Sequence, residues 1–436
     1  MIVPSNRLLF WFALVALPFA ILGAAFPSAL ILSAGMIGGL LLVLLFDGVS
    51  SLRSLAGIRV NLPHIVRMSK DRDSSLDLGI HNPSLRSRVI RVGLAMPRSF
   101  EVPDEELLVT LPADHEWSQL AWKCRPLERG KYQITRVYIE GPSALGFWAV
   151  RAELPANTEI RVYPNLLTER KSLGHLFLNR GMIGVHRARQ IGKGREFEKL
   201  REYVPGDSYE DVHWKATARK GHPITKVFQI ERTQEIYVVI DTSRLSARQD
   251  VLERFLTTAL LLGLAAEQQG DLFGVMTFSD KVENFVRARN GKAHYNACRD
   301  AIYSLTPRQV NPAFDEMCSF IRLNLRRRSM IIILTALDDP LLAESFEHQV
   351  DLIARQHVLL VNMVQPRGAV PLFTSPATNS IDDIYEQLGG HLRWHDLREL
   401  GKKLQRRGVG FAVLENEQLG TEVVSQYLQM KQRQLL

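Results

Sequence analysis

The first 46 residues contain two long stretches without a charged side chain, residues 8–26 and 29–46. Each is close to the roughly 20 apolar residues that a helix needs to cross the hydrocarbon of a bilayer. Only Pro27 and Ser28 separate them, which leaves room for a tight turn. The sequence therefore predicts a transmembrane hairpin of two antiparallel helices over residues 1–48. A signal peptide is the alternative, but it has a shorter apolar region and needs no second span.

Basic residues flank this hairpin. Arg7 precedes the first stretch, and Arg53 and Arg59 follow the second. The positive-inside rule then places both chain ends, and the whole soluble region, in the cytoplasm. The full chain carries 54 Lys and Arg against 46 Asp and Glu, a net charge of +8. Such a mild basic excess suits a surface that faces anionic lipid, and we expect no nucleic-acid partner.

Residues 49–168 change to short runs of alternating apolar and polar residues, with Pro and Gly at the breaks. Runs of this kind predict an antiparallel β-sandwich-like domain. None of its residues has a catalytic spacing, so we expect a spacer or docking module close to the membrane.

Residues 235–436 alternate strand-like and helix-like segments. Residues 235–241 form a continuous apolar strand that ends in an acid, as expected of a strand buried on both faces. Later strands are expected at 272–278, 330–335, 357–363 and 409–414, with helices between them that include separate segments at 381–388 and 397–407. This alternation predicts a doubly wound, mostly parallel α/β sheet.

Acidic and hydroxyl side chains lie at the carboxyl ends of two of these strands, where such sheets bind ligands. Asp241 and Ser243 close the first strand, and Asp338 follows the strand that begins at Met330. No glycine-rich phosphate loop follows either strand, which argues against nucleotide binding. Oxygen ligands of this kind are those that Mg²⁺ prefers, so Mg²⁺ is the cofactor to consider.

The order of Asp-x-Ser, apolar helix and the run GVMTFSD resembles a von Willebrand factor A-type domain. The resemblance implies that its metal-ion-dependent adhesion site falls on Asp241, Ser243, Asp338 and, for the middle loop, Thr306 or Asn311. Leu245 stands where that family carries a second serine. An occupied Mg²⁺ site and a degenerate, metal-free site both remain open, with the metal-free form preferred.

Between the two soluble domains lies a predicted linker, residues 169–234, whose segment 194–221 is rich in charged and aromatic residues. It contains a string of signature residues: Arg201, Tyr203, Pro205, Gly206, Asp207, Trp214, Lys215 and Arg219. This string is similar to that of the bacterial membrane family catalogued as domain of unknown function 58. An Arg-Gly-x-Tyr pattern at 129–132 and a Pro-x-x-Leu-Gly pattern at 142–146 add to the resemblance. Glu210 departs from it, because the family usually carries Arg there.

The resemblance implies a protein of the bacterial inner membrane, without established catalytic activity, that works with a MoxR-type AAA+ ATPase. A non-enzymatic adaptor in the assembly or maturation of protein complexes is therefore the expected function. Two alternatives stay open. One is a metal-dependent hydrolase or nuclease that uses Asp207, Asp211, His213 and His222 of the linker. The other is a purely structural envelope protein.

The signature itself allows two interpretations. Pro205 fixes φ and Gly206 permits positive φ, so the two form a sharp turn ahead of Asp207. Arg201 and Arg219 offer planar guanidinium groups to carboxylates. A buried ionic clasp onto the first strand of the α/β domain is the preferred interpretation, since buried charges are normally paired. The alternative is a docking surface whose charges stay exposed until a partner binds.

Overall fold

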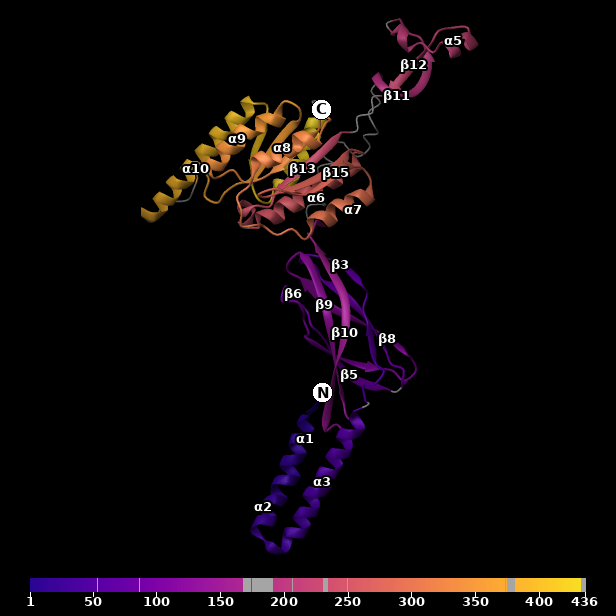
Figure 1. The fold of residues 1–436 in the computed structure, drawn as a ribbon, viewed down its shortest axis with the longest axis vertical. Coiled ribbons are helices and arrows are strands. Elements are labelled where there is room, and N and C mark those ends of the chain that lie inside the picture. Colours follow the sequence, from indigo (N-terminus) through magenta and orange to yellow (C-terminus); the bar gives the residue numbers. More distant parts are fainter. Residues whose placement is uncertain are drawn as a thin grey trace. The chain divides into compact units, whose positions relative to one another are not determined.

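The computed structural model describes residues 1–52, 54–85, 87–167, 174, 191–205, 207–229, 234–248, 250–372, 374 and 381–432, with only the backbone of 191–199 and 227–229. Arg53 and Gly206 thus lie outside the described residues. The chain divides into two compact units, Met1–Asn165 and Leu166–Leu436, which we describe separately (Figure 1).

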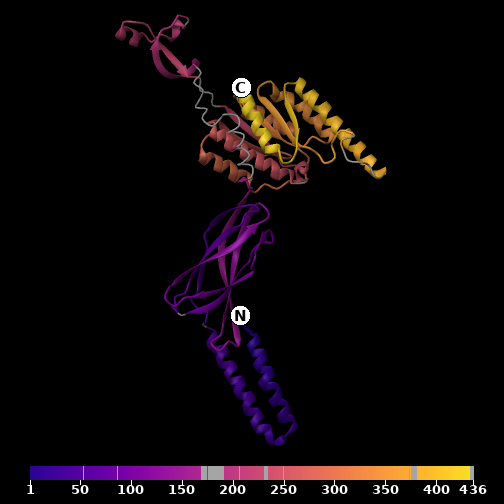
Figure 2. The ribbon, with the colours of Figure 1, turned by 180° about the vertical axis from the view of Figure 1, so that it is seen from behind.

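After the short strand β1 (Ile2–Pro4), the first unit has two apolar helical segments that lie side by side (Figures 1 and 2). The first comprises α1 (Asn6–Trp11), a π-helical turn (Phe12–Ala16) and α2 (Leu17–Ala25). A 3₁₀ turn (Pro27–Ala29) leads into α3 (Leu30–Ser51). Phe26 is extended at φ −130°, because the residue before a proline is disfavoured in the helical region, and α2 ends there. The spans Asn6–Ala25 and Pro27–Ser51 are long and apolar enough to cross a membrane.

The helices confirm the two predicted apolar spans, and most of their large apolar side chains are exposed rather than packed in a protein core. The second helix is longer than expected. It runs beyond the apolar stretch through Asp47 to Ser51, so that a carboxylate lies within it.

Two sheets follow and enclose one apolar core. The six-stranded sheet contains β1 (Ile2–Pro4), β3 (Ile65–Ser69), β5 (Arg88–Leu94), β7 (Glu106–Leu111), β9 (Gly130–Pro142) and β10 (Trp148–Tyr163). The four-stranded sheet contains β2 (Arg59–Asn61), β4 (Ser74–His81), β6 (Phe100–Glu101) and β8 (Trp117–Pro126). The expected antiparallel pairing holds for most of these strands, but β3 pairs with β10 in parallel.

The alternation of apolar and polar residues along the strands explains how this core forms. In β4, Leu76, Leu78 and Ile80 are fully buried, whereas Asp77 between them is exposed. Successive side chains of a strand point to opposite faces, so one face packs inward and the other meets solvent.

The second unit contains the predicted linker, and part of it has regular structure of its own. β11 (Ile191–Glu202) and β12 (Ile224–Gln229) form an antiparallel two-stranded sheet. A 3₁₀ turn (Tyr209–Asp211) and α5 (Trp214–Lys220) lie between the two strands in sequence. We call residues 200–226 the signature segment. α5 begins where the His213 ring accepts a hydrogen bond from the Ala216 amide, and it ends at Gly221, whose φ of +74° suits glycine.

A six-stranded sheet forms the rest of this unit, in the order β15-β14-β13-β16-β17-β18. Its strands are β13 (Glu235–Asp241), β14 (Leu272–Phe278), β15 (Val282–Arg289), β16 (Met330–Leu334), β17 (Val358–Val364) and β18 (Gly410–Leu414). All neighbours are parallel except β15, which pairs antiparallel with β14 at the edge. The predicted mostly parallel sheet is therefore present.

Helices cover both faces of the sheet. One face packs on α6 (Val251–Gln268), α7 (Lys292–Ile302) and α11 (Leu419–Gln432), and the other on α8 (Phe314–Asn324), α9 (Pro340–Ala354) and α10 (Ile381–Arg406). β13 serves both cores, because Ile236, Val238 and Ile240 point to the first face and Tyr237 and Val239 to the second.

The prediction of two helices at 381–388 and 397–407 is wrong, because α10 runs without interruption. The sequence pair Gly389-Gly390 resembles a helix break. In the structure Gly390 instead allows close packing, since a Cβ at this position would overlap the carbonyl oxygen of Gly368. Gly390 thus allows α10 to approach a loop closely, and it does not mark the end of a helix.

Candidate functional site

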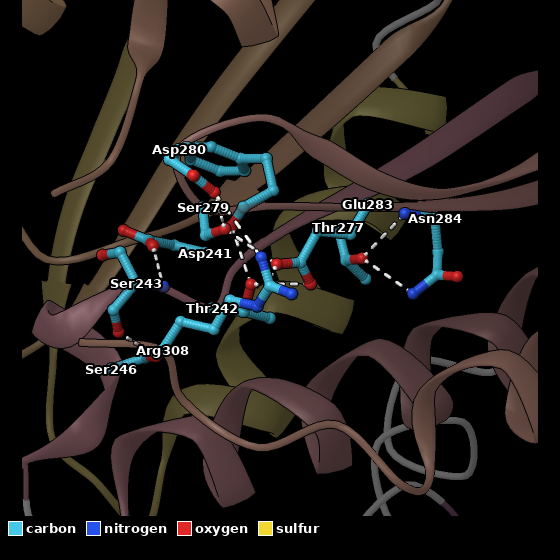
Figure 3. A network of polar contacts seen from close by, with 11 residues as sticks. Asp241, Thr242, Ser243, Ser246, Thr277, Ser279, Asp280, Glu283, Asn284 and Arg308 are labelled. Atoms are coloured by element: carbon cyan, nitrogen blue, oxygen red, sulfur yellow. Dashed lines mark hydrogen bonds and ion pairs between the residues drawn. The ribbon is translucent and has the colours of Figure 1, made fainter. Parts of the chain in front are cut away.

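Asp241, the last residue of β13, belongs to a polar cluster at the carboxyl edge of the sheet (Figure 3). Its fully buried carboxylate accepts a hydrogen bond of 2.6 Å from the Thr335 hydroxyl and one of 2.8 Å from the Ser243 amide. Burial raises the pKa of Asp241, and the hydrogen bonds from Thr335 and Ser243 oppose that rise. Both carboxylate oxygens therefore have protein partners.

The turn after Asp241 is stabilised by hydrogen bonds between its own residues. The Ser243 hydroxyl accepts from the Leu245 amide at 3.3 Å, and the Ser246 hydroxyl donates to the Ser243 carbonyl at 2.8 Å. Leu245 is buried, so this position contributes an apolar side chain and no oxygen to the cluster.

Arginine side chains neutralise the acids that surround this turn. Arg248 binds the Asp338 carboxylate at 2.8 Å. Arg244 donates to the Asn311 side chain at 2.5 Å and lies 3.6 Å from the Asp339 carboxylate. The second Asp338 oxygen is buried and has no hydrogen-bond partner in the described parts of the chain.

A third arginine, Arg308, lies against two acids on the other side of the cluster (Figure 3). Its guanidinium is 3.0 Å from Glu283 and 3.6 Å from Asp280. The Ser279 hydroxyl lies 2.7 Å from Glu283 and 2.9 Å from Asp280. The hydrogen bond from Ser279 and the charge of Arg308 lower the pKa of Asp280. At this edge of the sheet, arginine guanidinium groups thus supply the positive charges beside the acidic side chains.

These contacts do not fit an occupied Mg²⁺ site, the less favoured of the two forms considered for these residues. Asp338 already has a cation in Arg248, Leu245 offers no ligand, and Asn311 is held by Arg244. Thr306, the other middle-loop candidate, is exposed in the loop after α7. Across the residues that the structure describes, no group of three or more His, Cys, Asp or Glu side chains could hold a metal ion. Sequence reasoning placed Asp241 and Ser243 together correctly but missed Thr335, which directly follows β16.

The signature segment has an ion pair at its turn. Arg201 binds Asp207 at 2.7 Å, and the other Asp207 oxygen accepts from the Val204 amide at 3.1 Å. These two interactions, the amide bond first, lower the pKa of Asp207. The Arg201 and Asp207 side chains remain 32% and 18% exposed, so the predicted buried clasp is wrong in this respect. The pair closes a turn between Val204 and Asp207, within the segment.

Four other signature side chains are exposed to solvent. Trp214 is 67% exposed, and Pro205, Lys215 and Arg219 are also exposed. The Tyr203 ring stacks on that of Tyr209 at 5.9 Å between centroids.

Three of the four residues of the hydrolase alternative have other partners. Asp207 is paired with Arg201, and His213 caps α5 through Nδ1. His222 lies 3.4 Å from Glu202, on the exposed surface. Each of these three side chains thus has a local structural contact.

Asp47 is a residue that sequence reasoning missed. It lies near the end of α3, is fully buried, and accepts hydrogen bonds from the Ser143 hydroxyl at 2.6 Å, the Leu145 amide at 2.9 Å and the Phe147 amide at 3.3 Å. The Trp148 indole donates to the Leu44 carbonyl of the same helix at 2.9 Å.

These contacts join the second apolar helix to the loop between β9 and β10. The Ser5 hydroxyl also donates to Gly146 of this loop at 2.6 Å, so the chain before α1 is attached there too. The available signal in the sequence was an acid directly after an apolar stretch, together with the Pro-x-x-Leu-Gly pattern at 142–146. That pattern is the loop that binds Asp47.

Comparisons with known proteins agree with the resemblance carried by the signature. Curated relatives include uncharacterized proteins of Mycobacterium bovis and Mycobacterium tuberculosis, each 25% identical over 191 residues. The alignment covers 42% of this chain and 59% of each relative, so the chain spans about three fifths of the curated relatives that it matches.

Among solved structures, the protein BatB from Bacteroides thetaiotaomicron matches 46% of this chain and 99% of its own, with 15% identity and a TM-score of 0.31. An aerotolerance-related membrane protein from Bacteroides fragilis matches 45% and 98%, with 14% identity and a TM-score of 0.29. The family model described as "Protein of unknown function DUF58" matches residues 199–371, from β11 to beyond β17, so the predicted family resemblance is confirmed for this region.

Proposed function

We propose that the chain is a membrane-anchored, non-enzymatic adaptor whose signature segment docks a MoxR-type AAA+ ATPase. The adaptor would act in the assembly or maturation of protein complexes at the bacterial inner membrane, with its soluble units in the cytoplasm. The observation that carries the proposal is the exposure of Trp214, with the basic side chains of Lys215 and Arg219 on the same short helix.

Exposed aromatic and basic side chains are typical of binding surfaces. Trp, Tyr and Arg are enriched among the residues that dominate interface energies. Trp214 and Tyr209 leave large apolar areas in water, and burial of such area against a partner is favourable. The Arg201–Asp207 pair supports the surface by fixing the turn that precedes Tyr209 and α5.

The proposed orientation depends on the charges that flank the hairpin. Arg7 lies in the first turn of α1, ahead of the apolar residues of the first span, and Arg59 follows the second span. Cytoplasmic loops carry an excess of Lys and Arg, and both ends of a two-span hairpin lie on one side.

An adaptor also fits the chemistry of the strand-end cluster better than a hydrolase does. A general base or a metal ligand needs a carboxylate that can reach a substrate or an ion. Asp338 and Glu283 are instead paired with arginine side chains, and both Asp241 oxygens accept hydrogen bonds from the protein.

Replacing Trp214 with alanine is expected to reduce capture of the ATPase from detergent-solubilised membranes by about thirtyfold, because loss of an interface hot spot costs about 2 kcal/mol or more. Trp117→Ala is the matched control, since Trp117 is 56% exposed on the β-domain and lies outside the signature segment. Melting temperatures should be unchanged for both variants. Equal capture by Trp214→Ala and wild type would contradict the docking surface.

Mg²⁺ binding provides a separate test of the strand-end cluster. We expect millimolar Mg²⁺ to leave the melting temperature of the wild-type protein unchanged. The double variant Leu245→Ser, Arg248→Ala restores a hydroxyl and removes the cation at Asp338, so it should gain Mg²⁺-dependent stability of about 2.7 kcal/mol at one hundred times Kd. Adding Asp241→Asn should abolish the gain. A wild-type protein that is already stabilised by Mg²⁺ would show that the arginines do not replace the ion.

A further inference from the structure

The solvent face of the four-stranded sheet in the first unit has an open hollow of about 530 Å³. It lies where β2, β4 and β8 pair side by side. Its volume falls within the roughly 300–1,000 Å³ of small-molecule sites. We call it the Gly79 hollow, and its lining includes Asn61, His64, Asp77, Gly79, Trp117 and Gln119.

Strand pairing brings three of these residues into one row across the sheet. Asn61 of β2 lies opposite Gly79 of β4, and Gly79 lies opposite Gln119 of β8. Opposite residues of paired strands point to the same face. Here it is the solvent face, because Leu78 and Ile80 on either side of Gly79 point into the core. The glycine therefore leaves a gap between two amide side chains.

The contacts of the chain do not require a glycine at position 79. Its φ lies outside the positive range, and a Cβ there would meet ordinary contacts, 3.6 Å from the Asn61 carbonyl oxygen and 3.7 Å from the Trp117 ring. β4 also pairs with β2 and β8 without a bulge. A glycine inside a strand weakens it and, apart from bulges and bends, marks places where a ligand or another backbone comes close. The backbone atom closest to this Cβ position belongs to the paired strand β2, so a ligand is the reason that fits.

Trp117 forms one wall of the Gly79 hollow. The residue is 56% exposed, and two atoms of its benzene ring lie 3.7 and 3.8 Å from the place that a Cβ on Gly79 would take. The His81 ring contacts the indole with 4.8 Å between ring centroids, which restricts the movement of the indole. A large aromatic surface is thus held in place beside the hollow, where the apolar face of a ligand can stack on it.

The polar side chains around the Gly79 hollow are free to bind a ligand. Asn61, Asp77 and Gln119 are exposed, and within the described parts of the chain none of these side chains makes a hydrogen bond or an ion pair. The two amides offer both donors and acceptors, and the carboxylate offers acceptors. The hollow therefore combines one aromatic wall with hydrogen-bonding groups of both kinds.

We propose that the Gly79 hollow binds a neutral saccharide. A pyranose ring has an apolar face of C–H groups, which packs on the Trp117 indole. Its hydroxyl groups both donate and accept hydrogen bonds, so they match the amides of Asn61 and Gln119 and the carboxylate of Asp77. The proposal is independent of the ATPase docking, because the signature segment contributes no residue to the described lining of the hollow.

Other classes of ligand fit this lining less well. The described residues that line the hollow include no Lys or Arg, so a phosphate would lack the cationic side chains that normally bind it. A quaternary ammonium group is normally enclosed by several aromatic rings, whereas the indole of Trp117 is the one large ring in the described lining. An extended peptide that adds to a sheet pairs with an edge strand, and this hollow lies on the face of the sheet.

Binding of neutral saccharides to the full chain tests the proposal. The chain is reconstituted in phosphatidylcholine nanodiscs, because glycoside detergents would compete for the hollow, and is applied to an array of neutral mono-, di- and trisaccharides. We expect the wild type to bind at least one of them. Trp117→Ala should weaken this binding by about tenfold, because it removes the stacking surface. Failure of the wild type to bind any neutral saccharide, or equal binding by Trp117→Ala, would overturn the proposal.

Gly79→Val separates ligand binding from folding. Valine fills the hollow and is favoured in strands, so saccharide binding should fall by about tenfold while the melting temperature stays equal or rises. Ser75→Val is the matched control, because Ser75 is exposed on the same face of β4 but does not line the hollow. It should bind the saccharide like the wild type. Equal binding by the two variants would contradict the proposal, and so would binding that is confined to anionic glycans.

Discussion

Replacing Asp47 with alanine is expected to destabilise the first unit more than any exposed substitution. The change leaves the Ser143 hydroxyl and the amides of Leu145 and Phe147 without their acceptor. An unsatisfied buried donor costs about 1–3 kcal/mol, and hydrogen bonds to a charged acceptor lie at the upper end, so we expect a loss of about 3–5 kcal/mol. Thermal unfolding of the full chain in mild detergent measures it.

The matched control is Asp77→Ala, an acid that is exposed on β4, for which we expect a change within about 0.5 kcal/mol. Limited proteolysis gives a second measurement. Cleavage between α3 and β2 should be faster in Asp47→Ala, because the helix is no longer attached to the β9–β10 loop. If Asp47→Ala melts and is cleaved like Asp77→Ala, the attachment does not depend on this carboxylate.

Replacing Asp271 with alanine is expected to destabilise the α/β domain by about 3–5 kcal/mol, because it leaves a partner charge unpaired. The Asp271 carboxylate is almost fully buried between β14 and α11. It accepts from the Tyr427 hydroxyl at 2.5 Å and the Gln234 amide at 3.2 Å, and lies 2.6 Å from the Lys431 ammonium. Burial, and after it the Asp271 charge, raises the pKa of Tyr427. The Tyr427 hydroxyl therefore stays protonated and donates to Asp271.

Hydrogen exchange measures this effect locally, because α11 should lose its protection before the sheet does. Glu422→Ala is the control, since Glu422 is an exposed acid on the same helix. Protection of α11 that is equal in Asp271→Ala and Glu422→Ala would show that packing on α6 alone retains the helix.

Local patterns in the sequence predicted the strands in which buried residues are continuous or recur at a regular spacing. The apolar run at 235–241 is β13, and β4 (Ser74–His81) is one of the alternating runs expected within residues 49–168. The break expected between residues 388 and 397 is wrong, because glycines such as Gly389 and Gly390 occur both at helix ends and at sites of close packing. Only the position of Gly368 beneath α10 distinguishes these two uses, and that position is a tertiary fact.

The candidate sites depend on contacts between residues that are distant in the sequence. Arg248 and Asp338 are 90 residues apart, and Asp47 and Ser143 are 96 apart. The sequence predicted that Asp241 and Ser243 would be neighbours, because the end of one strand fixes both. It could not predict which cation would face Asp338, since side chains from several loops compete for that carboxylate.

The attachment of both apolar helices to one strand has a mechanical consequence. β1 pairs with the start of β10, and Trp148 at that start binds α3. The 16 residues of β10 extend about 50 Å, and shortly after its far end the chain enters the second unit. β10 is thus one continuous strand, and its first residues are expected to move with the hairpin. The register of β10 with β9 shifts between Pro155 and Thr158. Strands bend at irregularities of this kind. A tilt of the membrane helices would therefore displace the residues beyond Tyr163. The bend in β10 would determine the size and direction of that displacement.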